Sequence, residues 1–184
     1  MKFDLALIGF GVIGVEALHT LILKVKKKQI INVVVIDKDI KNIPGGVAYS
    51  KINSKYGFFN NPLRLSHPSF KSWVRNKYNM DKFINFVKKN KNYALQDWLD
   101  SNSKNLIKKN VSGEVYFPRL VYSFYLEDRI NDILKKLKNL NLRIFFFQGE
   151  VKKINFQKEY LQLIPKSNFN SFQIFANKKL LNIS

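Results

Sequence analysis

The hydrophobic pattern at the start of the chain predicts a strand, a helix and a second strand in succession. Residues 3–8 form a short apolar run typical of a buried strand, and residues 30–36 form a second run rich in Ile and Val. Between them, apolar residues recur with helical spacing at Val15, Leu18, Leu21, Ile22 and Val25. Because such a crossover is right-handed in nearly all proteins, we expect the two strands to lie parallel and adjacent.

The pattern changes twice after the second strand. Residues 43–66 are rich in Gly, Pro, Asn and Ser, and this loop region is longer than the roughly 12–15 residues of an ordinary connection. Its aromatic residues favour an ordered segment. Helical spacing returns at residues 80–89, 93–106 and 120–137, which predicts a helical insertion over about residues 67–139.

The C-terminal part of the chain predicts four strands. A third parallel strand is expected at residues 142–147, followed by short segments at residues 150–156, 160–164 and 172–176 that are typical of an antiparallel meander. The sequence therefore predicts one α/β domain over residues 1–184, with a parallel sheet, a helical insertion and a β-meander.

Three glycines lie where the first strand meets the helix. In the spacing Gly9-x-Gly11-x-x-Gly14, the first glycine permits a tight turn, the second lets the backbone approach a pyrophosphate, and the third packs the helix close to the sheet. Asp37 ends the second strand, 23 residues after Gly14, close to the spacing at which a carboxylate reaches the ribose diol of a dinucleotide. Since this carboxylate would repel a 2′-phosphate, the pattern predicts a Rossmann-like site for FAD or NAD rather than NADP. The alternative is a glycine turn that merely packs, with Asp37 as a strand-end cap.

Composition narrows the possible chemistry. The chain has no Cys, which excludes disulfides, thiolate catalysis and cysteine-ligated metals, and its two His residues leave little for a metal site, so we predict none. No apolar run approaches the roughly 20 residues that a membrane span needs. A cytoplasmic setting is therefore predicted.

The charge balance is strongly basic. The chain carries 32 Lys and Arg against 13 Asp and Glu, a formal net charge of +19. Such a surplus suggests binding to nucleic acid or to an anionic surface. The lysines are scattered along the chain, however, and solvated helix faces are the interpretation that we favour.

Further motifs resemble those of a known family. They are Gly-Val-Ala-Tyr-Ser at residues 46–50, Asn-Asn-Pro at 60–62 with Ser66 four residues on, Asp-Trp-Leu at 97–99, and Phe-Pro-Arg-Leu-Val-Tyr-Ser-Phe-Tyr-Leu at 117–126. With the glycine turn they cover most of residues 3–126 and resemble the FAD-NAD(P)-binding family of the two-dinucleotide-binding flavoprotein superfamily. Two residues depart from the family pattern: Ser123 stands where Gly is usual, and Val12 where Pro or Ala is common.

The resemblance implies a function and a missing part. It implies the FAD/NAD(P)-binding domain of a flavin-dependent oxidoreductase or hydroxylase acting on a small molecule, with NAD(P)H as reductant. In the superfamily the meander leads into a strand with an Ala-Thr-Gly-like turn and then into a further domain, whereas this chain stops at residues 182–184. We therefore expect the domain to be incomplete at its C-terminus, with the NAD(P)H site in the missing part. An NAD-dependent dehydrogenase and a basic binding module without catalysis remain as alternatives.

Spacing and resemblance together give the expected cofactor-binding residues. These are Gly9, Gly11, Val12, Ile13, Gly14, Asp37, Lys38, Gly46, Ala48, Tyr49, Asn60, Ser66 and Arg119. Arg119 suits a phosphate or an anionic substrate, the alternative being a surface ion pair with Glu127 or Asp128. Core packing is favoured over ring stacking for Tyr122 and Tyr125, and His67 is interpreted as a surface histidine. No catalytic residue is predicted, which is consistent with a cofactor that carries the chemistry.

Overall fold

The computed structural model describes residues 2–25, 30–40, 44–51, 57–107, 113–137, 139–156, 160–166, 174–177 and 180–182. The chain divides into two compact units, one formed by residues 1–47 with 128–184 and the other by residues 48–127.

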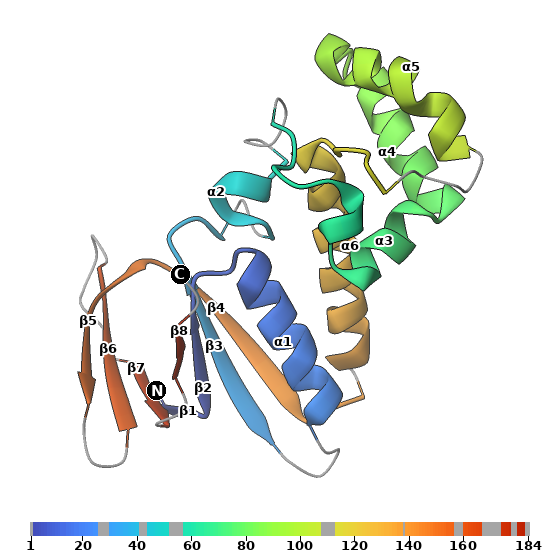
Figure 1. The fold of residues 1–184 in the computed structure, drawn as a ribbon. Helices are drawn as coiled ribbons and strands as arrows, with labels where there is room; N and C mark the ends of the chain where they lie inside the picture. Colours follow the sequence, from blue (N-terminus) through green and yellow to red (C-terminus); the bar gives the residue numbers. More distant parts are fainter. Residues whose placement is uncertain are drawn as a thin grey trace. The chain divides into compact units, whose positions relative to one another are not determined.

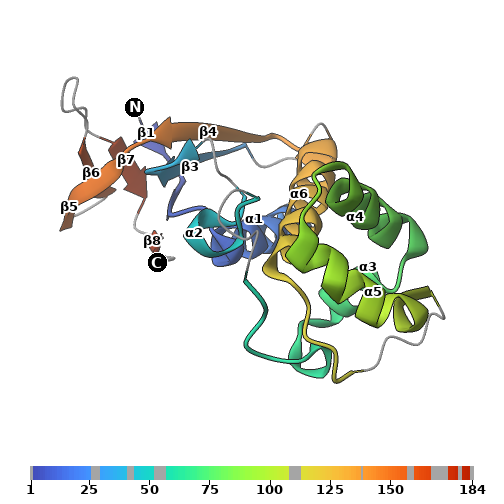
Figure 2. The ribbon, with the colours of Figure 1, turned by 90° about the horizontal axis from the view of Figure 1, so that it is seen from above.

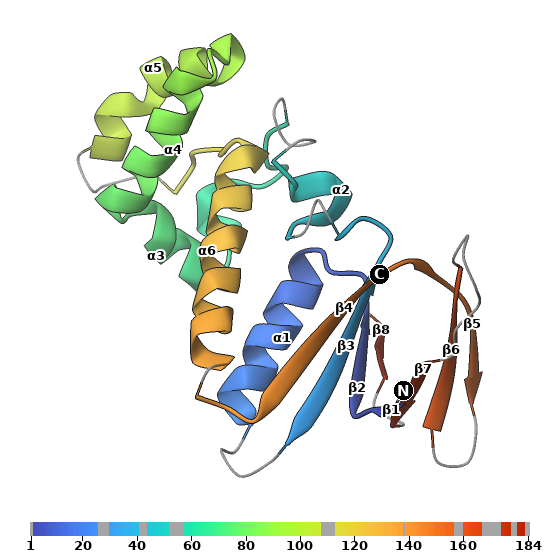
Figure 3. The same cartoon turned by 180° about the vertical axis from the view of Figure 1, so that it is seen from behind.

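The first unit contains a parallel sheet covered by a helix. Its strands are β2 (Leu5–Ile8), β3 (Ile31–Asp37), β4 (Leu142–Gln148) and β8 (Leu180–Asn182), in the order β4-β3-β2-β8. All three pairings are parallel. Helix α1 (Val12–Lys24) joins β2 to β3 and lies along one face of this sheet (Figures 1 and 3). The predicted strand–helix–strand unit and the α/β fold class are confirmed.

The other sheet of this unit contains the meander. Strands β5 (Glu150–Phe156), β6 (Tyr160–Lys166) and β7 (Ile174–Asn177) pair antiparallel, as predicted. The strand predicted at residues 3–8 is interrupted at Asp4, because Lys2–Phe3 form a separate strand, β1, that pairs parallel with β7 in this sheet.

A short strand that was not predicted lies near the C-terminal end. Residues 180–182 form β8, which pairs with β2 so that Asn182 lies opposite Ile8. Three residues carry too little periodicity to predict a strand, and β8 is defined by its pairing with β2.

The two sheets pack against each other through apolar side chains. Because side chains alternate along a strand, Ala6, Val34 and Ile36 point away from the face that α1 covers and form a buried cluster with Phe3 of β1. The ring of Phe3 meets that of Phe145 edge to face, with 5.4 Å between centroids. This buried cluster therefore stabilises the parallel sheet, in which strand β2 leads directly into the glycine turn.

The second unit is helical. Helices α4 (Lys77–Lys89) and α5 (Tyr93–Ile107) lie side by side, and α3 (Pro68–Val74) precedes them (Figures 1 and 2). Helix α6 (Arg119–Leu137) begins in this unit. The helices predicted at 80–89, 93–106 and 120–137 are confirmed. The short elements α2 (Gly46–Tyr49), η2 (Leu63–Leu65) and α3 were not predicted.

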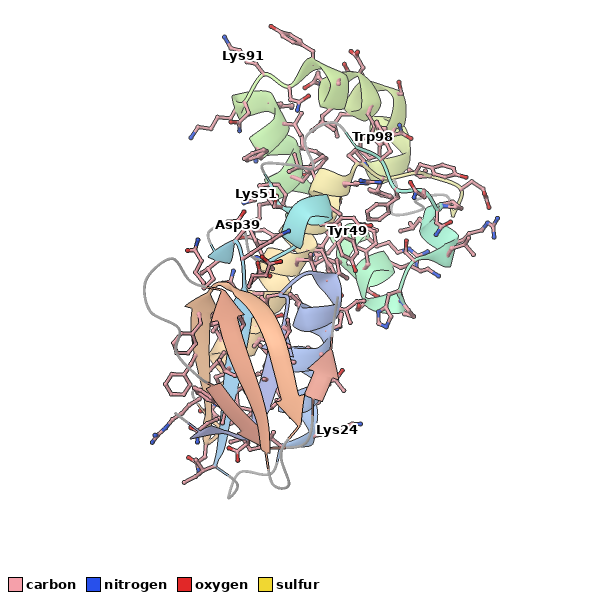
Figure 4. The ribbon with its side chains drawn as sticks, turned by 90° about the vertical axis from the view of Figure 1, so that its left-hand side faces the viewer. Lys24, Asp39, Tyr49, Lys51, Lys91 and Trp98 are labelled. Carbon is pink, nitrogen blue, oxygen red and sulfur yellow. The ribbon has the colours of Figure 1, made fainter. Side chains whose placement is uncertain are left out.

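Aromatic side chains fill the helical unit. Phe70 contacts several rings, among them Tyr122 at 4.9 Å and Tyr125 at 5.4 Å between centroids. Tyr125 is buried, which confirms its predicted core packing, whereas Tyr122 is half-buried. Trp98 on α5 is labelled in Figure 4, and its indole N–H donates to the Tyr116 carbonyl oxygen at 3.0 Å. Among the described residues, no helix is long and apolar enough to cross a membrane.

Candidate functional site

The glycine turn at residues 9–14 leaves the N-terminus of α1 open. Gly9 has a φ of 84°, which only glycine adopts readily, and its N–H donates to the Ile36 carbonyl oxygen at 2.8 Å. Gly11 is the N-cap of α1, without a side-chain cap and without an acidic residue in the first turn. The first helical hydrogen bond runs from the Val15 N–H to the Gly11 carbonyl oxygen at 3.1 Å. The N–H groups of the first turn therefore carry a partial positive charge that suits a phosphate.

Gly14 and Gly11 differ in whether the packing of the fold requires a glycine at that position. A Cβ on Gly14 would lie 2.8 Å from the Gly9 carbonyl oxygen and 3.2 Å from the Phe10 ring, so packing requires glycine there. A Cβ on Gly11 would meet nothing within 4 Å, and the φ of Gly11 is an ordinary −75°. The fold itself therefore does not require glycine at position 11.

A second glycine segment reaches the same turn. Gly45 and Gly46 have φ values of 118° and 58°, and a Cβ on Gly46 would lie 3.6 Å from the Gly11 Cα. The positive φ values agree with a turn that needs glycine. Gly46 is thus brought against Gly11, although 35 residues separate them in the sequence.

Asp37 ties the end of β3 to the glycine turn. Its Oδ2 accepts the Phe10 N–H at 2.6 Å and its Oδ1 accepts the Asp39 N–H at 2.8 Å. Its carbonyl oxygen accepts the Gly149 N–H at 2.9 Å, which links β3 to the residue after β4. Because a carboxylate oxygen can accept more than one hydrogen bond, both oxygens retain capacity for the hydroxyls of a ribose.

The remaining candidates of this unit differ in exposure. Val12 is half-buried and Lys38 is exposed. The Ile13 side chain is 60% exposed on the first turn of α1. The structure thus brings Gly9, Gly11, Gly14, Asp37 and Gly46 together, with Val12 and Ile13 on the adjoining helical turn.

In the helical unit, Arg119 and Tyr49 lie close together. The guanidinium carbon of Arg119 is 6.0 Å from the centroid of the Tyr49 ring, and its Nε donates to the Phe58 carbonyl oxygen at 3.0 Å. We find no ion pair of Arg119 among the described residues. Glu127, one of the partners considered for it, instead pairs with Lys51 at 2.7 Å.

Three further candidates belong to this unit. Ala48 and Asn60 are exposed, and Ser66 is half-buried at the end of η2, where its N–H donates to the Leu63 carbonyl oxygen at 2.9 Å. In the part of the chain that the structure describes, no hydrogen bond joins the side chain of Asn60 or Ser66 to another candidate residue.

One polar arrangement was not predicted. His67 is exposed, as expected, but its Nδ1 lies 2.6 Å from the Ser69 Oγ, which in turn lies 2.7 Å from the buried Tyr125 hydroxyl. His67 also caps α3, since its Nδ1 accepts the Ser69 N–H at 3.3 Å. The His-Pro-Ser order at a helix start was the available signal, but the link to Tyr125 joins residues 56 positions apart.

His19 has a shifted pKa on the buried side of α1. Burial lowers the pKa of His19 below its ordinary value of 6.5, and the positive charge of Arg129 lowers it further. Arg129 forms an ion pair with Glu16 at 3.1 Å. The negative charge of Glu16 raises the pKa of His19, but it does not outweigh burial and Arg129. Within the described residues no group of carboxylate or imidazole side chains is arranged to hold a metal ion.

Comparison with known proteins gives a match over most of the chain. A family model described as FAD-NAD(P)-binding matches residues 6–172. No curated protein matches the chain.

Solved structures of a hydroxylase, an oxidase and a dehydrogenase are similar to this chain at low identity. The chain is similar to ornithine hydroxylase from Pseudomonas aeruginosa, with 18% identity and a TM-score of 0.46 over 98% of this chain and 38% of that one. It is similar to L-α-glycerophosphate oxidase with FAD bound from Mycoplasma pneumoniae, with 12% identity and a TM-score of 0.42 over 98% and 53%. It is similar to L-proline dehydrogenase from P. horikoshii, with 10% identity and a TM-score of 0.36 over 98% of this chain and 22% of that one. The chain thus spans about half or less of the length of these proteins.

Proposed function

We propose that this chain, which belongs to the FAD-NAD(P)-binding family, binds the ADP half of FAD at its glycine turn. The observation that carries this proposal is the open space at Gly11. Nothing in the fold needs glycine there, whereas a pyrophosphate that approaches the backbone does. The uncapped first turn of α1 supplies N–H groups for its oxygens, and Gly9 and Gly46 let the backbone pass close by.

The adenosine end of the cofactor is assigned to Asp37. Its carboxylate is held by two backbone N–H groups and keeps acceptor capacity for the two ribose hydroxyls. A carboxylate at this position repels a 2′-phosphate, which supports FAD over NADP as the nucleotide bound here. Lys38, Val12 and Ile13 are proposed to contact the same half of the cofactor.

We assign the remaining contacts to the helical unit. Ala48, Tyr49, Asn60, Ser66 and Arg119 carry the family motifs and are proposed to bind the rest of the cofactor or the substrate. Arg119 and Tyr49 are supported by their mutual contact. Asn60 and Ser66 are supported by the sequence motif alone.

The reaction that we propose is flavin-dependent oxidation or hydroxylation of a small molecule, with NAD(P)H as reductant. When bound, the flavin would supply the electron-transfer chemistry, and the residues of this chain would bind it and orient it. A cytoplasmic setting belongs to the same proposal. Family membership favours this function over a basic module without catalysis.

The test is a pair of substitutions at Gly11. Gly11→Ala is expected to fold normally, with a melting temperature within about 3 °C of the wild type, because its Cβ meets no neighbour. Its FAD affinity is expected to fall at least about tenfold, since the methyl group occupies the path of the pyrophosphate. Gly11→Ser is expected to lower FAD affinity similarly while stabilising the fold, because serine is a good N-cap.

Gly14→Ala is the contrasting variant, because its Cβ clashes with backbone and should reduce both stability and FAD affinity. Affinity is measured by quenching of FAD fluorescence, with NAD⁺ titrated in parallel. Unchanged FAD affinity in both Gly11 variants would refute the assignment. Tight binding of NAD⁺ in place of FAD would favour the dehydrogenase alternative.

A further inference from the structure

The Arg119 side chain is held in one orientation by the backbone of the segment before η2. The Arg119 N–H donates to the Gly57 carbonyl oxygen at 2.7 Å, and its Nε donates to the Phe58 carbonyl oxygen at 3.0 Å. Phe58 also pairs with Pro118 in an isolated β-bridge. The two segments are therefore joined at Pro118 and at Arg119 itself, which fixes the base and the middle of the Arg119 side chain.

Gly57 provides the room for this arrangement. A Cβ at position 57 would lie 3.0 Å from the Arg119 Cδ and 3.3 Å from its Nε. Any larger residue would push the guanidinium away from the Phe58 carbonyl oxygen. The close packing of side chain on backbone reduces the number of rotamers open to Arg119, so little conformational entropy remains to be lost when a ligand binds.

Tyr49 is the second fixed partner of the guanidinium. Its ring lies 5.0 Å from that of Tyr122 and 5.9 Å from that of Phe59, measured between centroids. Its carbonyl oxygen accepts a hydrogen bond from the buried Ser123 hydroxyl, at the position where the family usually has glycine. Tyr49, the last residue of α2, is labelled in Figure 4. The ring is thus a rigid surface for the flat guanidinium.

The geometry points to Arg119 as the residue that binds an oxyanion of the ligand, through the two terminal nitrogens of its guanidinium. Since Nε is engaged by the Phe58 carbonyl oxygen, the remaining edge is the fork formed by Nη1 and Nη2. Such a fork matches two oxygens of one carboxylate or one phosphate. Glu127, the acid of α6 that was considered as an ion-pair partner of Arg119, is paired with Lys51 at 2.7 Å.

This inference deepens the proposed function and rests on it for the source of the oxyanion. The oxyanion would belong either to the phosphate of the flavin nucleotide or to an anionic substrate. Both sources present an oxyanion to Arg119. They differ because the first requires a bound flavin nucleotide and the second requires a bound substrate.

The experiment follows the side-chain nitrogens of Arg119 by NMR in ¹⁵N-labelled protein. Riboflavin, FMN, FAD, inorganic phosphate and acetate are titrated separately, and acetate is titrated again into protein saturated with FAD. A saturable shift with FMN and FAD but not with riboflavin identifies the cofactor phosphate. A saturable shift with acetate that persists in the presence of FAD identifies a substrate carboxylate.

Variants test whether the NMR shift reports binding of the anion by the Arg119 side chain. Arg119→Gln is expected to weaken the affinity for the responding anion at least about tenfold, because a charge-assisted hydrogen-bond pair is lost. Arg119→Lys is expected to behave similarly, since an ammonium cannot bond to Phe58 and present a fork at the same time. Arg75→Gln, which removes an exposed arginine from the same unit, is the matched control and should leave the affinity unchanged.

Two results would overturn the inference. One is the absence of a saturable shift at Arg119 with all five probes in the wild-type protein, which needs no variant to fold. The other is an unchanged anion affinity in folded Arg119→Gln. Saturable anion binding at Arg119 without FAD binding would refute the proposed function and leave this inference standing. FAD binding without a shift of the Arg119 signals would refute this inference and leave the proposed function standing.

Discussion

The carboxylate of Asp37 has two tasks, one in the fold and one in the proposed site. Replacing it by Asn leaves one acceptor oxygen and directs an amide NH₂ at the N–H of Phe10 or of Asp39, which lie 2.6 and 2.8 Å from the present oxygens. We expect Asp37→Asn to lower the free energy of unfolding by about 1–2 kcal/mol, since a half-buried hydrogen bond to a charged group is lost. Urea denaturation measures this loss.

The same variant tests the ribose contact. FAD affinity is expected to fall at least about tenfold, while FMN, which lacks the adenosine, should bind Asp37→Asn as it binds the wild type. Asp39→Asn is the control, because it removes one charge from the same turn and keeps the backbone N–H that Asp37 accepts. Equal losses for FAD and FMN would show that Asp37 acts only by holding the glycine turn.

His19 makes the stability of the first unit sensitive to acid. Its pKa in the folded protein lies below the ordinary value of 6.5, so below that pH the unfolded chain binds more protons than the folded one. Stability is therefore expected to fall as the pH drops from about 6.5 towards the lowered pKa, and this loss is absent above that range.

Arg129, Glu16, Lys136 and Asp132 all act on this titration, so the neighbouring charges must stay in place. His19→Gln preserves them and removes the titrating group. Melting temperatures of the variant and the wild type, compared between pH 5 and 7.5, are expected to differ in slope only below the ordinary histidine pKa of about 6.5. Parallel curves over the whole range would show that the burial of His19 has no consequence for stability.

How much of the site follows from the sequence depends on the distance between partners along the chain. Gly9, Gly11 and Gly14 are spaced within one turn, and the end of a β-rich run places Asp37, so local pattern sufficed. The contact of Gly46 with Gly11 and the contact of Gly57 with Arg119 join residues far apart in the sequence. Such contacts depend on the path of the whole chain, and no local pattern encodes them.

At the scale of elements, long periodic segments were predictable and short ones were not. The stripe along residues 120–137 predicted α6 nearly to its ends, whereas β1 has two residues and β8 has three. These strands exist because β7 and β2 offer unpaired edges to them. Helix α3 has seven residues, too few for a clear helical period, and depends on Pro68 and the His67 cap at its start.

Helix α3 provides a prediction at this scale. Tyr125→Phe removes the hydroxyl that contacts Ser69 and leaves the buried ring in place. The free energy of unfolding is expected to fall by about 1 kcal/mol, and the amides of α3 should exchange faster with solvent. His67→Asn is expected to have little effect, since Asn is also a good N-cap. Unchanged exchange in α3 for Tyr125→Phe would show that aromatic packing alone holds this helix.

At the scale of the whole molecule, the basic charge is spread over both units. Residues 48–127 contain 14 Lys and Arg and 5 Asp and Glu, a balance of 14 − 5 = +9, which leaves 19 − 9 = +10 for the other 104 residues. Neither unit holds a disproportionate share. This even distribution is typical of solvated surfaces and does not indicate a nucleic-acid interface confined to one unit.

Salt dependence distinguishes a cofactor site from a basic surface. At the proposed site the pyrophosphate meets backbone N–H groups at the N-terminus of α1, and that helix has no basic residue in its first turn. FAD affinity is therefore expected to fall by less than about tenfold between 50 and 200 mM KCl. A nucleic acid that contacts 6–10 phosphates would lose about 10³–10⁵-fold over the same range. The measurement is a fluorescence titration of FAD at both salt concentrations, with a single-stranded oligonucleotide as competitor. Displacement of FAD by the oligonucleotide, with a steep salt slope for both ligands, would contradict the cofactor site and support the basic module, because only shared lysines could couple the two.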